Sequence, residues 1–118
     1  MFRRGILTAC LLASGLLGGC YGNFDSFAQR KAHLECVRMK KCDGDAYQNY
    51  YRGKADRCRD DREDAWHDFN AIADAAGLEY DPEEGRLCIE AAYENRRVCG
   101  SDAQEEINEA CLVVNIWD

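Results

Sequence analysis

The feature that most constrains this chain is a set of six cysteines spread over residues 36 to 111. They are Cys36, Cys42, Cys58, Cys88, Cys99 and Cys111. The closest two are six residues apart, whereas cysteine-based zinc sites favour close pairs such as CxxC. In an exported chain, an even set of this kind predicts three disulfides, and each bridge adds about 2–4 kcal/mol to the stability of a small domain.

The N-terminus has the layout of a secretory signal. Arg3 and Arg4 form a basic start, residues 6–17 are mostly apolar, and small residues follow up to Cys20. The apolar run has 12 residues, fewer than the roughly 20 that a membrane-spanning helix needs. We therefore divide the chain into a leader over residues 1–19, a short tether over residues 20–25 and a folded domain over residues 26–118.

The end of the leader, Leu17-Gly18-Gly19-Cys20, resembles the lipobox of bacterial lipoproteins, although Gly18 departs mildly from the commonest residues at its position. The resemblance implies cleavage before Cys20 and attachment of acyl chains such as palmitate to that residue. Because Tyr21 stands where an Asp would favour the inner membrane, it also implies the outer membrane as destination. An ordinary secretory signal with an unmodified Cys20 is the alternative.

Capping signals and apolar periodicity predict an all-α fold of about four helices, with no confident strand. The predicted helices cover residues 26–41, 54–76, 82–99 and 101–114, and a short helix follows the first. The expected caps and breaks are Ser26, Asp45, Gly53, Gly77, Asp81, Pro82, Gly100 and Ser101. The apolar stripes predict a core of Phe27, Leu34, Val37, Cys58, Ala65, Phe69, Ile72, Ala76, Leu87, Cys88, Ala91, Val98, Ala103, Ile107, Ala110, Cys111 and Val114.

Cysteine spacing favours two stapled helical hairpins. Cys36–Cys58 and Cys88–Cys111 have nearly equal separations, 22 and 23 residues, and each joins two successive helices. Cys42–Cys99 would then tie the hairpins together. The rival pairing is Cys42–Cys58 with Cys36–Cys99, which a complete break at Gly53 would allow. Cys88 and Cys99 cannot pair if they share one helix, because eleven residues of helix span about 16 Å.

Two clusters are candidate binding sites. Asp60, Glu63, Asp64 and His67 combine carboxylates with an imidazole at helical spacing, which could hold a divalent metal, or could form only a solvated face. Tyr47, Tyr50 and Tyr51 could form an aromatic interaction surface, or could pack a connecting segment onto the bundle.

Charge and composition limit the function. The chain has a net charge of -7, which argues against nucleic-acid binding. Residues 25–62 carry ten basic and seven acidic side chains, and residues 63–118 carry three and fifteen. The half nearer the tether could therefore tolerate anionic headgroups, but a charged surface that only keeps the domain soluble is the interpretation we favour. No serine, thiol or Gly-rich loop has a catalytic context, so we do not expect an enzyme.

The sequence therefore predicts an envelope lipoprotein, attached to the membrane through acylated Cys20, that acts as a binding or structural module. Its expected partner is an envelope protein or polysaccharide, and its only expected cofactor is the covalent lipid. A metal-holding protein and an enzyme of unrecognised class are the alternatives. The whole chain resembles short, cysteine-rich helical lipoproteins of unknown function of the kind found in myxobacteria, a likeness of architecture and cysteine spacing that implies no activity.

Overall fold

The computed structural model describes residues 22–118, so the predicted leader and Cys20 lie outside the described residues. The described part is all-helical, as predicted, and its β contact is an isolated bridge between Tyr80 and Trp117. Its helices are α2 (Phe24–Cys42), α3 (Gly44–Tyr51), α4 (Ala55–Ala75), α5 (Pro82–Glu94), α6 (Ser101–Ala110) and α7 (Val113–Ile116). Within this part, no helix combines the length and the apolar character that a membrane crossing requires.

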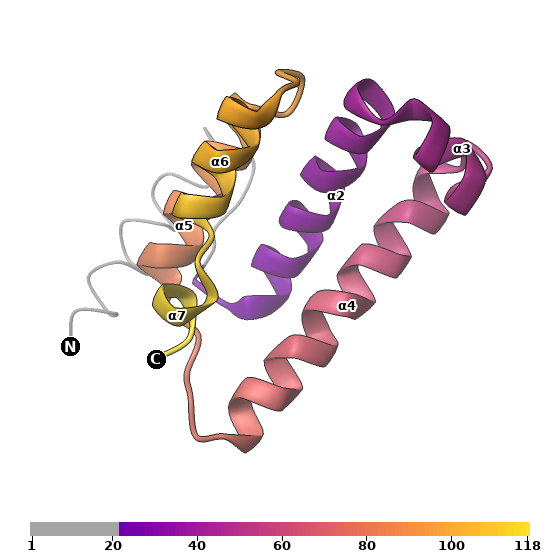
Figure 1. The fold of residues 1–118 in the computed structure, drawn as a ribbon. Helices are drawn as coiled ribbons and strands as arrows, with labels where there is room; N and C mark the ends of the chain where they lie inside the picture. Colours follow the sequence, from indigo (N-terminus) through magenta and orange to yellow (C-terminus); the bar gives the residue numbers. More distant parts are fainter. Residues whose placement is uncertain (1–21) are drawn as a thin grey trace.

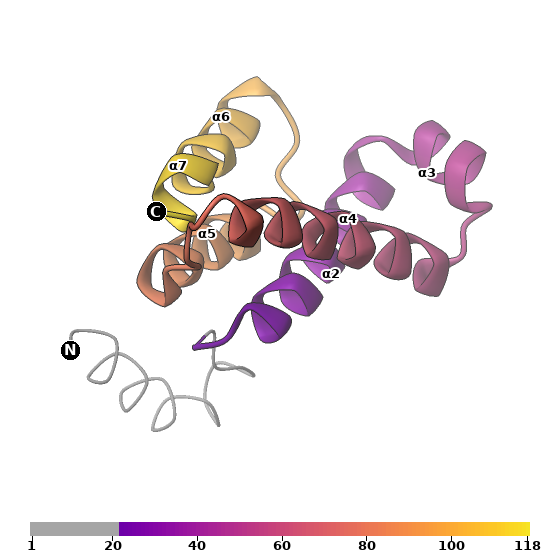
Figure 2. The ribbon, with the colours of Figure 1, turned by 90° about the horizontal axis from the view of Figure 1, so that it is seen from below.

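The helices form two antiparallel hairpins (Figure 1). Helices α2 and α4 form the first, with the short α3 in their connection, and α5 and α6 form the second. Helix α2 packs against both α4 and α5, so it is the helix of the first hairpin that contacts the second. Figure 2 shows α3 on one side of the α2–α4 pair and α6 and α7 on the opposite side. The two predicted hairpins are confirmed, and α7 is an additional short helix.

The signals at the α4–α5 connection work as predicted. Asp81 Oδ1 accepts hydrogen bonds from the backbone N–H groups of Glu83 at 2.9 Å and Glu84 at 3.3 Å. Pro82 occupies the first turn of α5, where its missing N–H costs nothing. Gly77 follows α4 with a φ of +80°, the left-handed conformation that glycine adopts without strain. The α4–α5 turn is therefore encoded locally.

Three predicted N-caps are wrong, because Ser26, Asp45 and Ser101 each lie inside a helix. Helix α2 starts earlier because the Asn23 side chain already accepts the Ser26 N–H at 2.9 Å, which makes the tether shorter than predicted. Asp43 precedes α3 and Gly100 precedes α6, both without a side-chain cap. In each case the N-cap lies one to three residues before the predicted one, at Asn23, Asp43 and Gly100.

Two helices end earlier than predicted. Helix α5 stops at Glu94, where the buried Asn95 side chain donates to the carbonyl of Ala91 at 2.9 Å and to Glu106 at 3.1 Å. An asparagine that bonds to the preceding turn in this way competes with helix continuation. Residues 95–100 form a loop, so Cys99 is not on α5. Helix α6 stops at Ala110 rather than continuing to residue 114.

The main core is rich in aromatic side chains. Trp117 is only 2% exposed; its ring stacks on that of Trp66 at a centroid distance of 6.0 Å, and its indole N–H donates to Asn70 at 2.8 Å. Phe27 is fully buried and contacts both indole rings. A second, smaller core contains Cys36, Tyr47, Tyr51 and Cys58.

Several predicted core residues are exposed instead: Ala65, Ile72, Ala76, Leu87, Val98 and Val114. On α4 the difference is a rotation of the buried face. Ile72 is 68% exposed, and Ala73 beside it is buried. The predicted stripe omitted Arg62 and Trp66, which face α2 and hydrogen-bond to it.

Three disulfides join the described cysteines. Cys36–Cys58 links α2 to α4, Cys88–Cys111 links α5 to the end of α6, and Cys42–Cys99 links the end of α2 to the α5–α6 loop. This is the pairing that the cysteine spacing favours, and the rival pairing is absent from the described residues. The Cys42–Cys99 bridge fixes the second hairpin against the first.

Candidate functional site

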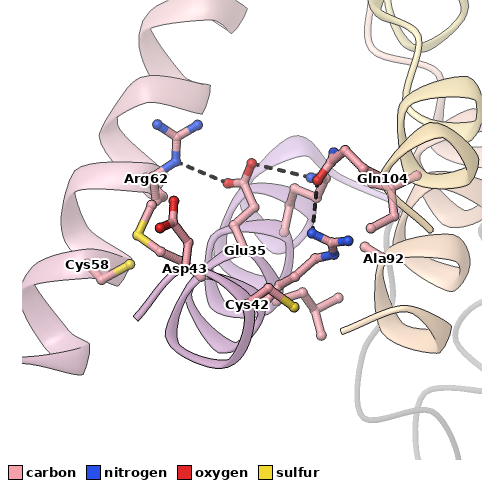
Figure 3. A pocket seen from close by; sticks show the side chains of 12 residues that line it. Glu35, Cys42, Asp43, Cys58, Arg62, Ala92 and Gln104 are labelled. Atoms are coloured by element: carbon pink, nitrogen blue, oxygen red, sulfur yellow. Dashed lines mark hydrogen bonds and ion pairs between the residues drawn. The ribbon is translucent and has the colours of Figure 1, made fainter. Parts of the chain in front are cut away.

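A pocket of about 290 Å³ lies between the two hairpins. Helices α2 and α4 form one side of it, and Ala92 of α5 with residues of α6 forms the other. Figure 3 shows Arg62 on α4 and Gln104 on α6 placed on either side of Glu35 on α2. Helix α2 packs closely against α4 and α5, whereas its Cα atoms stay more than 8 Å from those of α6, and the pocket lies in this wider gap.

Glu35 is the centre of the polar side of the pocket. Its carboxylate accepts from Lys31 Nζ at 3.3 Å, from Arg62 Nε at 3.4 Å and from Trp66 Nε1 at 3.0 Å. Lys31 and Glu35 are four residues apart on α2, and Arg62 and Trp66 are four residues apart on α4, so each pair shares a helix face. The packing of α2 on α4 brings the two pairs together.

Lys31 is unusual because the residue is only 5% exposed. Its ammonium lies 5.5 Å from the centre of the Trp66 ring and pairs with Glu35. Burial disfavours the charge of Arg62, but the charge and hydrogen bond of Glu35, together with Tyr51 and Asp61, outweigh that effect and raise the pKa of Arg62 above its ordinary value. The carboxylate of Glu35 is therefore shared by two cations.

Arg38 provides a third cation and connects α2 to the second hairpin. Its guanidinium donates to Gln104 Oε1 at 2.9 Å and to the carbonyl oxygens of Val98 at 3.0 Å and Gly100 at 3.5 Å. Its Nε–H is buried and has no hydrogen-bond partner among residues 22–118. Arg38 therefore spans the gap that α2 and α6 leave open.

The remaining wall of the pocket is mostly apolar. It is formed by Leu34, Met39, Ala92 and Ile107, together with sulfur atoms of two disulfides. Those disulfides, through Cys42 and Cys58, attach α2 to the α5–α6 loop and to α4. The backbone around the pocket is therefore covalently fixed on two sides, and its shape can persist without a ligand.

The structure does not bring the four predicted metal ligands together. His67 lies 3.8 Å from Glu63 and 3.9 Å from Asp25, whereas Asp60 and Asp64 are exposed elsewhere on α4. Among residues 22–118, no group of three or more histidine, cysteine or acidic side chains is arranged to hold a metal ion.

The three tyrosines do not form one surface. Tyr47 and Tyr51 are buried in the second core, whereas Tyr50 is 76% exposed. The Tyr51 hydroxyl donates to Asp61 at 2.5 Å. Burial, and then this hydrogen bond, raises the pKa of Tyr51 to about 12. Tyr47 and Tyr51 thus pack α3 onto the bundle, which was the alternative explanation of this cluster.

Sequence reasoning did not identify the pocket. The i, i+4 pairs of α2 and α4 are visible in the sequence, but a pair of this kind is usually a solvated surface pair. No protein-family model matches the chain, and no curated protein and no solved structure is significantly similar to it.

Proposed function

We propose that this chain is a lipoprotein of the bacterial cell envelope, anchored by acyl chains on Cys20, and that its helical domain is a binding or structural module held beside the membrane. The sequence Leu17-Gly18-Gly19-Cys20, preceded by a basic and apolar leader, carries the proposal. Tyr21 after the cysteine favours the outer membrane. Two or more acyl chains on one residue suffice for stable attachment.

The three disulfides support export. Disulfides persist in oxidising compartments such as the periplasm and are rare in the cytosol. All six cysteines of the described residues are paired. Bridges within both hairpins and between them are therefore expected in an exported chain rather than in a cytosolic one.

The start of α2 limits how far the domain can lie from the anchor. Only residues 21–23 separate Cys20 from Phe24, the first residue of α2. Three extended residues span about 10 Å. The binding role proposed here therefore concerns partners that reach the membrane surface.

Charge near the tether gives little support to attraction by anionic headgroups. Lys40 and Lys41, in the half of the sequence nearer the tether, lie in the last turn of α2. This turn is about 25 Å along the helix from Phe24. The first turn of α2 carries the acidic Asp25 instead. These two lysines are therefore remote from the tether, and attraction to anionic headgroups is not part of the proposal.

Metabolic labelling tests the anchor. Cells that express the full chain are fed an alkyne analogue of palmitate, and the purified protein is analysed by intact mass. We expect acyl mass on a chain that begins at Cys20. Cys20→Ser should abolish labelling, and Cys10→Ser, the matched control within the leader, should not. A product that starts at Met1, lacks acyl mass and carries free thiols would refute the proposal.

A further inference from the structure

We propose that the pocket between the hairpins binds a small organic carboxylate, with the carboxylate group near Lys31 and Arg38 and a short apolar chain against α5 and α6. The inference rests on the proposed binding role and gives it a ligand class. It does not require the lipid on Cys20, because the pocket is formed entirely by described residues of the helical domain.

The first argument is the hydrogen-bonding capacity of Lys31. An ammonium group has three N–H donors and no acceptor. The Lys31 side chain is 7% exposed, and among the described residues its acceptor is Glu35 alone, at 3.3 Å. Buried polar groups are satisfied by protein, water or ligand in nearly all proteins. A nearly buried ammonium that lines a pocket and has unused donors therefore favours an acceptor oxygen inside the pocket.

The second argument is the charge balance. Lys31, Arg38 and Arg62 bring three positive charges to the lining, whereas Glu35 and Asp43 bring two negative charges. Within the described part of the chain, the acceptors that Arg38 contacts are neutral oxygens, and its buried Nε–H has no acceptor. The pocket thus has one positive charge in excess, in a partly desolvated place where a carboxylate would make charge-assisted hydrogen bonds.

The third argument is the shape and chemistry of the apolar wall, which has residues from α2, α5 and α6. Leu34, Met39, Ala92 and Ile107 offer only apolar atoms from their side chains. A volume of about 290 Å³ is at the small end of ligand pockets, which start near 300 Å³. An inorganic anion would leave this wall unused, whereas a short-chain carboxylate would contact both sides. The two disulfides that contact the pocket attach α2 to α4 and to the α5–α6 loop, and so help to fix its shape for such a ligand.

The test uses the two tryptophans of the chain as reporters. Trp66 donates its indole N–H to Glu35 in the pocket, and Trp117 donates to Asn70 outside it. The oxidised protein, labelled with ¹⁵N, is titrated with butanoate, with its neutral analogue butanamide and with inorganic phosphate. We expect butanoate to shift the Trp66 indole signal with saturation, at a dissociation constant on the order of 1 mM for so small a ligand. The Trp117 signal should not move.

The three ligands and two lysine variants show whether binding needs both the negative charge and the apolar chain of the ligand. We expect butanamide and phosphate to bind at least about tenfold more weakly than butanoate. Butanamide lacks the negative charge that pairs with the cations, and phosphate lacks the apolar chain that contacts the apolar wall. Lys31→Met, which keeps the stem but removes the charge, should weaken butanoate binding about tenfold. Lys40→Met, an exposed lysine of the same helix, should leave it unchanged.

Several results would overturn the inference: no saturable shift with butanoate, equal binding of butanoate and butanamide, equal or tighter binding of phosphate, or unchanged binding after Lys31→Met. If Lys31→Met does not fold, the three ligands still decide the question on the unmodified protein. The titration works whether or not Cys20 carries acyl chains. A failure of the labelling experiment is therefore distinct from a failure of this one.

Discussion

The indole N–H of Trp66 donates a hydrogen bond to Glu35 across the α2–α4 interface, with 3.0 Å between Nε1 and Oε1. The same carboxylate pairs with Lys31 and Arg62. One acidic side chain therefore compensates the polar groups that both helices bury, and it does so at the edge of the aromatic core. The charge of Glu35 should consequently matter to stability more than that of an ordinary surface residue.

Glu35→Gln should destabilise the protein by about 2–3 kcal/mol, because it leaves the Lys31 ammonium buried without a counter-charge. Urea unfolding of the oxidised protein measures this change. Glu90→Gln is the matched control, since Glu90 also pairs with an arginine on a helix, but its side chain is 56% exposed against 23% for Glu35. The control substitution should lower the free energy of unfolding by less than about 1 kcal/mol. Equal losses for the two variants would show that the Glu35 cluster is no stronger than a surface pair.

Local signals explain what the sequence predicts well. Asp81, Pro82 and Gly77 act through their own backbone and nearest turn, so the α4–α5 connection follows from a few residues. The two bridges within the hairpins follow from spacing along the chain, because a hairpin brings residues on either side of its turn to the same level. Cys42–Cys99 is then the pair that remains. That pairing is the one in the structure even though Cys99 is in a loop and not on α5.

Tertiary packing explains what the sequence does not predict. The stripe that placed Ile72 in the core is a valid apolar face, but α4 turns Arg62 and Trp66 toward Glu35 instead. A charged residue on a buried face is unfavourable in isolation and becomes favourable only beside its partner on another helix. The pocket also depends on how the helices pack, because its polar residues come from three helices, and for this reason the sequence does not predict it.

Gly85 allows a close approach that an alanine would prevent. A Cβ atom added there would overlap the phenol ring of Tyr80, at 2.7 Å from Cζ. Gly85→Ala should therefore destabilise the protein by about 1–3 kcal/mol, although alanine has the higher helix propensity. Gly44→Ala is the control, because nothing lies within 4 Å of its added Cβ. Thermal unfolding should show a lower midpoint for the first variant only, and a stabilised Gly85→Ala would contradict this packing.

Asn23 should matter more than Ser26 for the start of α2. Asn23→Ala removes the side-chain oxygen that accepts the Ser26 N–H, and N-cap losses of this kind cost about 1 kcal/mol. Ser26→Ala should have little effect, because Ser26 lies inside the helix and alanine favours helix. The free energy of unfolding of the two variants distinguishes the structural cap from the capping box expected at Ser26. A larger loss of unfolding free energy for Ser26→Ala than for Asn23→Ala would instead support a helix that starts at Ser26.

Tyr51 should make stability fall at alkaline pH. Its pKa is raised from 10.0 to about 12 in the folded protein by burial and by the hydrogen bond to Asp61. Unfolded chains therefore lose this proton first, so the stabilisation is complete below pH 10 and decreases as the pH rises toward 12. Urea unfolding at pH 9, 10 and 11 should show a fall that Tyr51→Phe makes smaller, whereas Tyr50→Phe, which changes an exposed ring of the same helix, should leave it intact. If the free energy of unfolding falls equally with pH in the unmodified protein and both variants, groups other than Tyr51 cause the alkaline loss of stability.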